Sequence, residues 1–326
     1  MKPRDRVFAA LSLTEPDDLV PVWEIEFHLF NAFSREKLVI SQDYIRLTEA
    51  GRERAMRRNA EIMVDVAKRI GLCALSNIGP YWEVAPGEPA PMWYPPEDSE
   101  RFLPILRKAA GDDIFIMEWC QAMLLMPEAD DYLEFAYKLF DTPKEVDQMA
   151  RDKYKKGMEI ARRARDAGAD GLCAACDIAD TKGMYFSPEQ MDRFFLPYLR
   201  DWGREVAAMG MKSILHTDGN IMDALDNIAD SGINGLQAID PVAHMDIVEV
   251  KRRVGGKIAL CGNIDLGLLQ NGPIPAIEEE VKRICDGCKT GGGFVLGATN
   301  AVFTEIPAEH YLAMTAAGRQ FGRYVR

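Results

Sequence analysis

The amino-acid sequence predicts a single domain over residues 1–326, a closed barrel of eight parallel strands with a helix after each strand, the (β/α)8 or TIM barrel. Three observations indicate this fold class. Short apolar runs of strand length alternate with longer amphipathic stretches of helical period, the alternation is repeated eight times, and no long structureless gap separates the units. An open doubly wound sheet gives the same local alternation and is the alternative.

The first half of the chain supplies four of the strands. A short helix over 2–13 is closed by Thr14-Glu15-Pro16, and the first long strand follows over 19–30, LVPVWEIEFHLF. A long charged helix is expected over 44–70. The other expected elements of this half are strands 72–76, 114–118 and 172–177 and helices 99–110, 129–140 and 143–167.

The segment 81–96 stands apart from this alternation because it is rich in proline and aromatic residues. It holds five prolines together with Tyr81, Trp82, Trp93 and Tyr94. Such a composition is typical of a lid or pocket wall, in which Trp82 and Trp93 would contact the substrate. A rigid surface connection is the alternative.

In the second half, Ser187-Pro188-Glu189 begins a helix that is expected to run to Ala208. Four further apolar runs follow, each separated from the next by a helical stretch. They predict strands over 213–216, 235–240, 258–263 and 294–297.

Polar residues follow or end every predicted strand. They are Glu26, His28, Asn77, Glu118, Asp177, Asp180, His216, Asp218, Asp240, Asn263, Asp265 and Asn300. Barrel geometry brings the carboxyl ends of all strands to one rim, where catalytic groups collect. Carboxylates and imidazoles together can do acid and base work or hold a divalent metal through N and O ligands. For any single Asp or Asn, helix capping or turn chemistry is the alternative.

His216 is the strongest candidate at this rim. It is one of four histidines, it ends the apolar run 213–215, and Gly219 allows a tight turn after it. On the first strand, period two puts Val22, Glu24, Glu26 and His28 on one face, which is expected to line the barrel mouth. An edge strand with a solvated face is the alternative.

Charge and composition indicate which classes of partner and which cellular compartment to expect. A formal net charge of −12 argues against a nucleic-acid surface and against an anionic membrane surface. The start, MKPRDRVFAALSL, lacks the apolar core of a signal peptide, and no later run reaches membrane-spanning length. Seven cysteines, an odd number, fit a reducing compartment. We therefore expect a cytoplasmic protein.

Several stretches taken together resemble the uroporphyrinogen decarboxylase superfamily, a group of (β/α)8 barrels that also contains cobamide-dependent methyltransferases. The stretches are MKPRDRVFAAL, DIADTKGMYFSPEQMDRFFLPYL, HTDGNIMDALDNIADSGINGLQ, KIALCGNIDLGLL and GGGFVLGATNAVFTEIPAEHYLAM. The resemblance implies either decarboxylation or methyl transfer, and it implies a homodimer with paired barrels.

Departures from the two family patterns separate these chemistries. Decarboxylases of the superfamily have an arginine-rich loop after the first strand, which grips the substrate's carboxylates. Here residues 28–35 contain one arginine. Thiol-dependent methyltransferases bind zinc through His-x-Cys and a later cysteine. His216 matches, but Asp218 replaces the first cysteine, and Thr299 and Asn300 supply no thiol.

These departures imply a harder metal site that polarises an ether or hydroxyl oxygen. We expect a methyltransferase that passes a methyl group from a small O- or N-methyl substrate to a corrinoid on a separate corrinoid-binding protein. His216, Asp177 and Glu26 are the expected catalytic residues, and His216, Asp218 and Glu26 the expected ligands of zinc or another divalent metal. The expected substrate-binding residues are His28, Trp82, Trp93, Asp180, Asn263 and Asn300.

Two alternatives stay open. One is a metal-free decarboxylase of a small acid or a porphyrinogen-like substrate, in which Asp177 stabilises a protonated intermediate. The other is a barrel that binds a corrinoid or tetrapyrrole without turnover.

Overall fold

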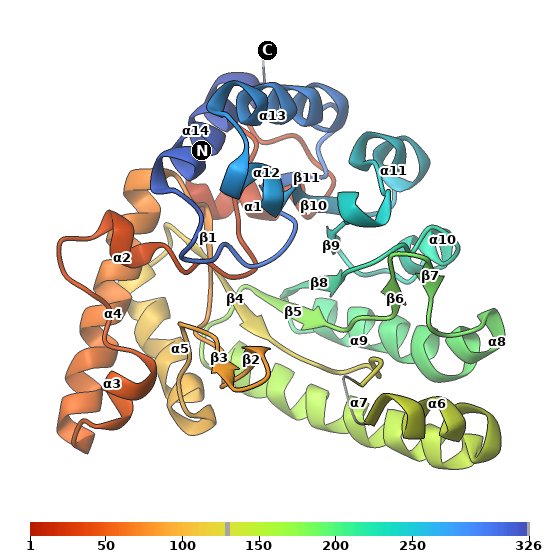
Figure 1. The fold of residues 1–326 in the computed structure, drawn as a ribbon. Coiled ribbons are helices and arrows are strands. Elements are labelled where there is room, and N and C mark those ends of the chain that lie inside the picture. Colours follow the sequence, from red (N-terminus) through yellow and green to blue (C-terminus); the bar gives the residue numbers. More distant parts are fainter. Residues whose placement is uncertain (128–130, 325–326) are drawn as a thin grey trace.

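The computed structural model describes residues 1–127 and 131–324 and contains a curled, all-parallel sheet of seven strands (Figure 1). The strand order is β1-β4-β5-β8-β9-β10-β11, so the strands of the sheet follow one another in sequence order. Their bounds are β1 Ala74–Ser76, β4 Phe115–Trp119, β5 Gly171–Ala175, β8 Lys212–Thr217, β9 Gly235–Ala238, β10 Ala259–Ile264 and β11 Phe294–Ala298. Two short antiparallel hairpins lie outside this sheet: β2 Glu83–Ala85 with β3 Glu88–Pro89, and β6 Ala179–Asp180 with β7 Gly183–Met184.

The segment 20–27 fills the place of the eighth strand. Its backbone bonds to both edges of the sheet, because the N–H of Cys73 donates to the carbonyl of Val22 at 2.7 Å and the N–H of Trp23 donates to that of Leu296 at 3.0 Å. Parallel bridges also join this segment to β11 and to the residues after it. The fold is therefore the predicted (β/α)8 barrel, and this prediction is confirmed.

The first predicted strand, 19–30, is wrong as a regular strand. It forms isolated bridges and bends at Ile25 and Glu26. Consequently Val22 and Glu24 do not face the barrel interior: Trp23 and Ile25 pack there instead. The Glu24 carboxylate accepts from the N–H of Ala298 at 2.8 Å and from the hydroxyl of Tyr311 on the outer helix α14 (Ala308–Phe321) at 3.0 Å.

Apolar side chains from alternate strand positions fill the barrel interior. Met117, Cys173, Ile214 and Cys261 belong to one buried cluster with Ile25. Helix α1 (Pro3–Ala10) contributes to the same cluster and so covers the end of the barrel opposite the carboxyl ends of the strands. Because side chains alternate along a strand, His216, two residues beyond Ile214, points to the same interior.

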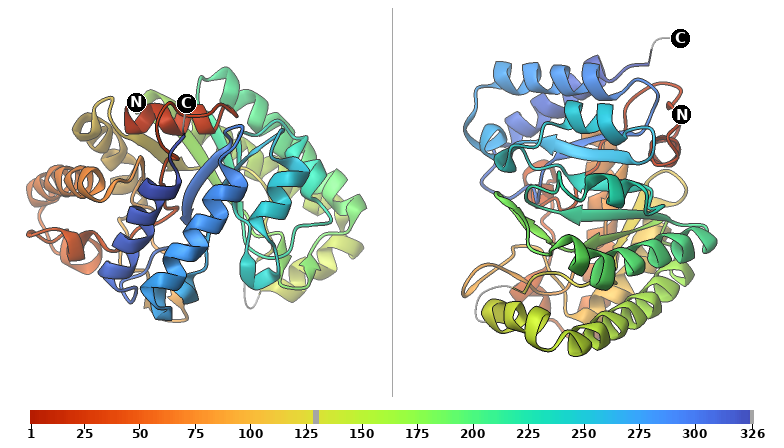
Figure 2. Two further views of the ribbon diagram at one scale, coloured as in Figure 1. Left: turned by 90° about the horizontal axis from the view of Figure 1, so that it is seen from above. Right: turned by 90° about the vertical axis from the view of Figure 1, so that its right-hand side faces the viewer.

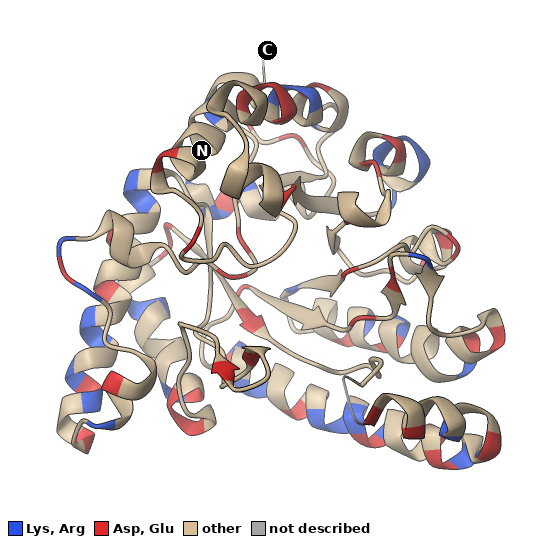
Figure 3. Cartoon of the chain, in the orientation of Figure 1, with Lys and Arg blue, Asp and Glu red and all other residues tan. Residues whose placement is uncertain are grey.

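The helices form an outer ring around the strands (Figures 1 and 2). The larger ones are α4 Glu49–Ile70, α5 Pro96–Ala110, α6 Asp131–Asp141, α7 Pro143–Asp166, α9 Leu196–Ala208, α11 Ile247–Val254 and α13 Ile274–Cys288. The shorter ones are α2 Phe30–Phe33, α3 Ser41–Ile45, α8 Pro188–Gln190, α10 Leu225–Ala229 and α12 Leu266–Asn271. Charged residues lie mainly on these helices, and acidic residues also follow several strands (Figure 3).

Local sequence explains where the helices begin and end. The predicted helix 44–70 is two helices, α3 and α4. Thr48 starts α4 by accepting a hydrogen bond from the N–H of Gly51, and Gly71 ends it with a positive φ of 92°. Ser187 and Gln190 form a capping box, after which a π-helical turn, Met191–Phe195, leads into α9.

Two further predicted segments contain regular structure. Segment 81–96, predicted to be a lid, a pocket wall or a rigid surface connection, contains the hairpin β2–β3 and the first residue of α5. The helix expected over 129–140 is helical from Asp131, and residues 129 and 130 lie outside the described residues.

Candidate functional site

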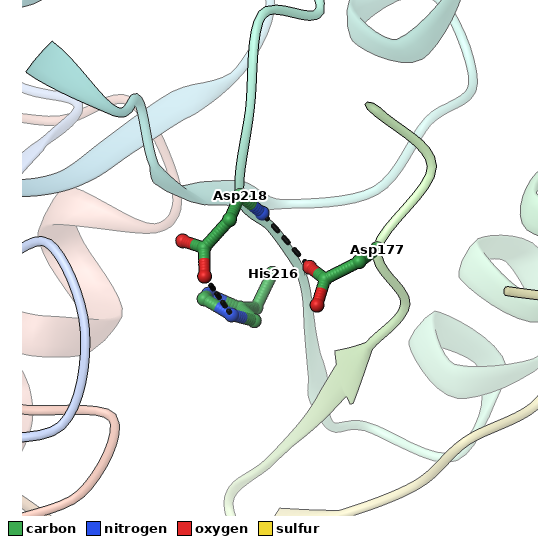
Figure 4. Close-up of side chains that lie close together, drawn as sticks. All are labelled: Asp177, His216 and Asp218. Atoms are coloured by element: carbon green, nitrogen blue, oxygen red, sulfur yellow. Dashed lines mark hydrogen bonds and ion pairs between the residues drawn. The ribbon is translucent and has the colours of Figure 1, made fainter. Parts of the chain in front are cut away.

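Three side chains converge at the carboxyl ends of two neighbouring strands (Figure 4). Asp177 lies two residues after β5, His216 lies in β8, and Asp218 follows β8 directly. Their candidate ligand atoms all lie within 4.8 Å of one another. His216 Nε2 is 3.9 Å from Asp218 Oδ2, and the N–H of Asp218 donates to Asp177 Oδ1 at 2.9 Å. One imidazole nitrogen with carboxylate oxygens is a donor set that suits a divalent cation such as zinc.

The second ring nitrogen of His216, Nδ1, contacts a side chain of the neighbouring strand. Nδ1 contacts Oε1 of Gln237, which is the register partner of His216 on β9. The amide nitrogen of Gln237 donates to the carbonyls of Ala298 at 3.2 Å and Thr299 at 3.0 Å. Both side chains are buried, so the imidazole plane is fixed by the neighbouring strands.

Asp218 is held in a similar way by Asn300. The amide of Asn300 donates to Asp218 Oδ2 at 2.5 Å, and its own oxygen accepts from the N–H of Ala301. Burial raises the pKa of Asp218, and the nearby Asp177 and Asp240 raise it further, whereas His216 and Asn300 act in the opposite direction. Acidic groups crowded in a half-buried place favour a bound proton or cation.

The expected residues Glu26 and His28 form a separate pair. His28 Nε2 lies 2.9 Å from Glu26 Oε2, and its ring meets Phe303 edge to face. In the described part of the chain, Glu26 does not belong to the group of Asp177, His216 and Asp218.

The remaining expected residues lie in several environments. Asp180 accepts from the N–H groups of Lys182 and Gly183 in the turn between β6 and β7, which matches the turn alternative. Asn263 is buried and donates to the carbonyl of Ile239 at 2.7 Å. Within the described residues, its side-chain oxygen has no hydrogen-bond partner.

The two tryptophans differ in exposure. Trp93 is buried and meets Tyr81 edge to face, whereas Trp82 is half-buried and lies 6.4 Å from the ring of Phe303. Phe303 also contacts His28. Segment 81–96 therefore reaches the side of the mouth where Glu26 and His28 lie.

Glu118 is a further titratable group at a strand end. Its carboxylate accepts from the N–H of Trp119 at 2.7 Å and from the amide of Asn77 at 2.6 Å. Burial raises the pKa of Glu118 to about 7, which these two hydrogen bonds oppose. It can therefore exchange a proton near neutral pH.

Gln237 was not expected to belong to the site. The sequence places it in the middle of an apolar run, GLQAI, where an amide carries no obvious chemistry. The available signal was that a buried polar side chain needs hydrogen-bond partners, and the neighbouring strand offers His216.

The chain is similar to known proteins in both sequence and fold. The sequence profile of the family described as "Uroporphyrinogen decarboxylase (URO-D)" matches residues 119–321, which is more than half of the chain. The chain belongs to the uroporphyrinogen decarboxylase family. The matched residues include Asp177, His216 and Asp218.

Members of the uroporphyrinogen decarboxylase family are also found among curated proteins. The chain is 38% identical over 171 residues to uroporphyrinogen decarboxylase from Cronobacter sakazakii, covering 51% of this chain and 46% of that protein. It is 36% identical over 140 residues to the Pseudomonas fluorescens enzyme, covering 42% and 38%. The chain thus matches less than half of the length of these relatives.

One solved structure has the same fold as this chain over nearly its full length. The structure of a methyltransferase from Methanosarcina mazei superposes with a TM-score of 0.64 at 20% identity, covering 98% of this chain and 99% of that one. At this identity the likeness shows the barrel fold alone.

In the described residues, no helix is both long and apolar enough to span a membrane.

Proposed function

We propose that the protein is a metal-assisted methyltransferase that moves a methyl group from a small O- or N-methyl substrate to a corrinoid carried by a partner protein. The observation that carries the proposal is the group of Asp177, His216 and Asp218 at the barrel mouth. It combines one nitrogen ligand with hard oxygen ligands, as expected for activating an oxygen or nitrogen leaving group instead of a thiol.

The residues present fit a divalent metal. His216 Nε2 and the carboxylates of Asp177 and Asp218 would hold it, and outer partners restrain two of these ligands: Gln237 on His216 and Asn300 on Asp218. Two carboxylates balance the charge of a divalent cation. When bound, such a metal withdraws electrons from the leaving oxygen or nitrogen of the methyl donor.

The other residues bind and orient the substrate. The Glu26–His28 pair would position the donor or exchange a proton with the leaving group. Trp82 and Trp93 would wall the pocket. In the transfer, the bond between the methyl carbon and the leaving atom breaks, the leaving atom keeps the electron pair and takes a proton, and the reduced corrinoid supplies the pair for the new bond.

The solved methyltransferase of the same fold supports this proposal, and the low arginine content after the first strand agrees with it. A corrinoid protein as partner, a homodimer and a cytoplasmic location stay predictions. Roles for Asp180, Asn263 and Asn300 in substrate binding also stay predictions.

Transfer to a reduced corrinoid protein tests the proposal. The purified protein with zinc would be given a panel of methoxyphenols and N-methylamines, and the absorbance of the methylated corrinoid would be followed. We expect transfer from at least one donor, loss of it in His216→Ala, and retention in Glu278→Gln, which changes an exposed acid on α13. Absence of transfer with every donor would contradict the proposal.

Decarboxylation of a small acid is a second candidate, favoured by the curated relatives at 36–38% identity. Asp177 would then stabilise a protonated intermediate. Carbon dioxide release from a carboxylated substrate in metal-free buffer, lost in Asp177→Ala, distinguishes it from methyl transfer. Binding of a corrinoid without either reaction would instead support a binding protein.

A further inference from the structure

We propose that Gln237 is a positioning residue that makes His216 Nδ1 the protonated ring nitrogen and so leaves Nε2 free for a metal or a proton. Two contacts carry this proposal. Gln237 Oε1 faces His216 Nδ1, and Gln237 Nε2 faces the carbonyl oxygens of Ala298 and Thr299.

The two carbonyls decide which way the amide of Gln237 points. An amide oxygen in the place of Nε2 would face two carbonyl oxygens with no hydrogen between them, whereas the nitrogen donates to both. The oxygen of Gln237 must then face the imidazole. An amide oxygen only accepts hydrogen bonds, so His216 Nδ1 must donate, and in the neutral ring Nε2 then carries the lone pair.

In this tautomer the nitrogen without a hydrogen, Nε2, is the one that faces the candidate metal ligands. Nε2 is the ring nitrogen turned toward Asp218 Oδ2, 3.9 Å away, in the group that can hold a metal. Histidine in water favours the other tautomer slightly, with the hydrogen on Nε2, which would block that side. Gln237 therefore fixes the tautomer in which Nε2 has no hydrogen. Its hydrogen bonds to the carbonyls at the end of β11 also connect His216 to the loop that carries Asn300, the partner of Asp218.

Part of this inference rests on the proposed function, because the metal affinity tested below presumes a metal site, whereas the tautomer does not. The test variant is Gln237→Leu, which removes both contacts. A matched control is Asn234→Ala. Asn234 also links β9 to β8, through the N–H of Ser213 at 3.0 Å, but at the opposite end of the strands.

The first readout is nitrogen NMR of the metal-free protein labelled with ¹⁵N-histidine, with the His216 signals assigned by their loss in His216→Ala. We expect the hydrogen on Nδ1 in the wild type and in Asn234→Ala. Gln237→Leu should shift the ring toward the tautomer with the hydrogen on Nε2. A wild-type ring with the hydrogen on Nε2 would overturn the proposal, even if Gln237→Leu fails to fold.

The second readout is zinc affinity by competition with a chelator. We expect Gln237→Leu to bind zinc about 10- to 100-fold more weakly, and Asn234→Ala to stay within about twofold of the wild type. Equal affinities in Gln237→Leu and Asn234→Ala, with an unchanged tautomer, would overturn the role of Gln237. If the wild type binds no zinc, the metal part of the proposed function fails, and the NMR result alone decides the role of Gln237.

Discussion

The backbone N–H of Asp218 donates to the carboxylate of Asp177 at 2.9 Å, which ties the loop after β8 to the loop after β5. Each of the two residues thus contributes to the position of the other. The same Asp177 carboxylate has a second oxygen that can serve as a ligand, so it can act in structure and in metal binding together.

This double role predicts different effects for two changes at Asp177. Asp177→Asn keeps an oxygen that accepts from Asp218 but loses the charge, so zinc affinity should fall more than about 100-fold, beyond the loss typical of an outer partner, while the melting temperature stays close to that of the wild type. Asp177→Ala should lower both. Chelator competition and thermal unfolding measure the two effects, with Asp180→Asn as the control. Unchanged zinc affinity in Asp177→Asn would show that this carboxylate is not a ligand.

The oxygen ligand that Asp218 would supply is expected to influence which metal ion the site prefers. Replacing its carboxylate by a thiolate, Asp218→Cys, should raise the ratio of zinc to manganese affinity, because a soft sulfur ligand favours zinc and an oxygen ligand suits manganese. Parallel titrations with the two ions measure the ratio. Asp240→Cys is a comparison on a nearby acid outside the group. A ratio that does not move in Asp218→Cys would place Asp218 outside the metal shell.

Glu24 makes stability depend on pH. Burial raises its pKa from 4.5 to about 8, partly opposed by the hydrogen bonds from Ala298 and Tyr311. The folded protein thus binds a proton that the unfolded chain releases at lower pH. The favourable contribution of Glu24 is complete below pH 4.5 and is lost as the pH rises through about 8.

Glu24→Gln should remove this dependence, because its amide can accept from Ala298 and donate to Tyr311. Between pH 5 and pH 9 the unfolding free energy of the wild type should fall by roughly a few kcal/mol relative to that of the variant. Urea unfolding at several pH values measures the difference. Glu278→Gln, an exposed position on α13, is the control and should show no such difference from the wild type. Parallel pH curves for wild type and Glu24→Gln would contradict the prediction.

Gly297 allows the segment 20–27 to close the barrel. A Cβ at Gly297 would lie 2.1 Å from the carbonyl oxygen of Trp23, so Gly297→Ala must push this segment away from β11. We expect a loss of about 3 kcal/mol of unfolding free energy. Gly256→Ala, where an added Cβ meets nothing within 4 Å, should change stability by less than about 0.5 kcal/mol. Equal stabilities for the two variants would show that the barrel is not closed in this way.

The barrel could be predicted because each strand and each helix has a recognisable local pattern, an apolar run or a helical period of apolar residues. The convergence of Asp177, His216 and Asp218 followed from the same rule, since parallel strands end at one rim. The first strand was mispredicted because period two assumes an unbent backbone, whereas this segment bends at Ile25 and Glu26.

Gln237 could not be found for a different reason. Its function depends on which residue is its register partner and on two carbonyls from β11, and none of these contacts is close in sequence. The pairing of Glu26 with His28, by contrast, is local, but its direction relative to the barrel depends on the same bend.

Zinc content after equilibrium dialysis tests the central claim most directly. Wild-type protein and His216→Ala would be stripped of metal, dialysed against dilute zinc, and measured by elemental analysis beside Asn234→Ala. We predict one zinc ion per chain in the wild type and in Asn234→Ala, and none held by His216→Ala. A wild type without zinc, or a His216→Ala variant that holds as much as the wild type, would contradict the assignment of a metal centre to Asp177, His216 and Asp218.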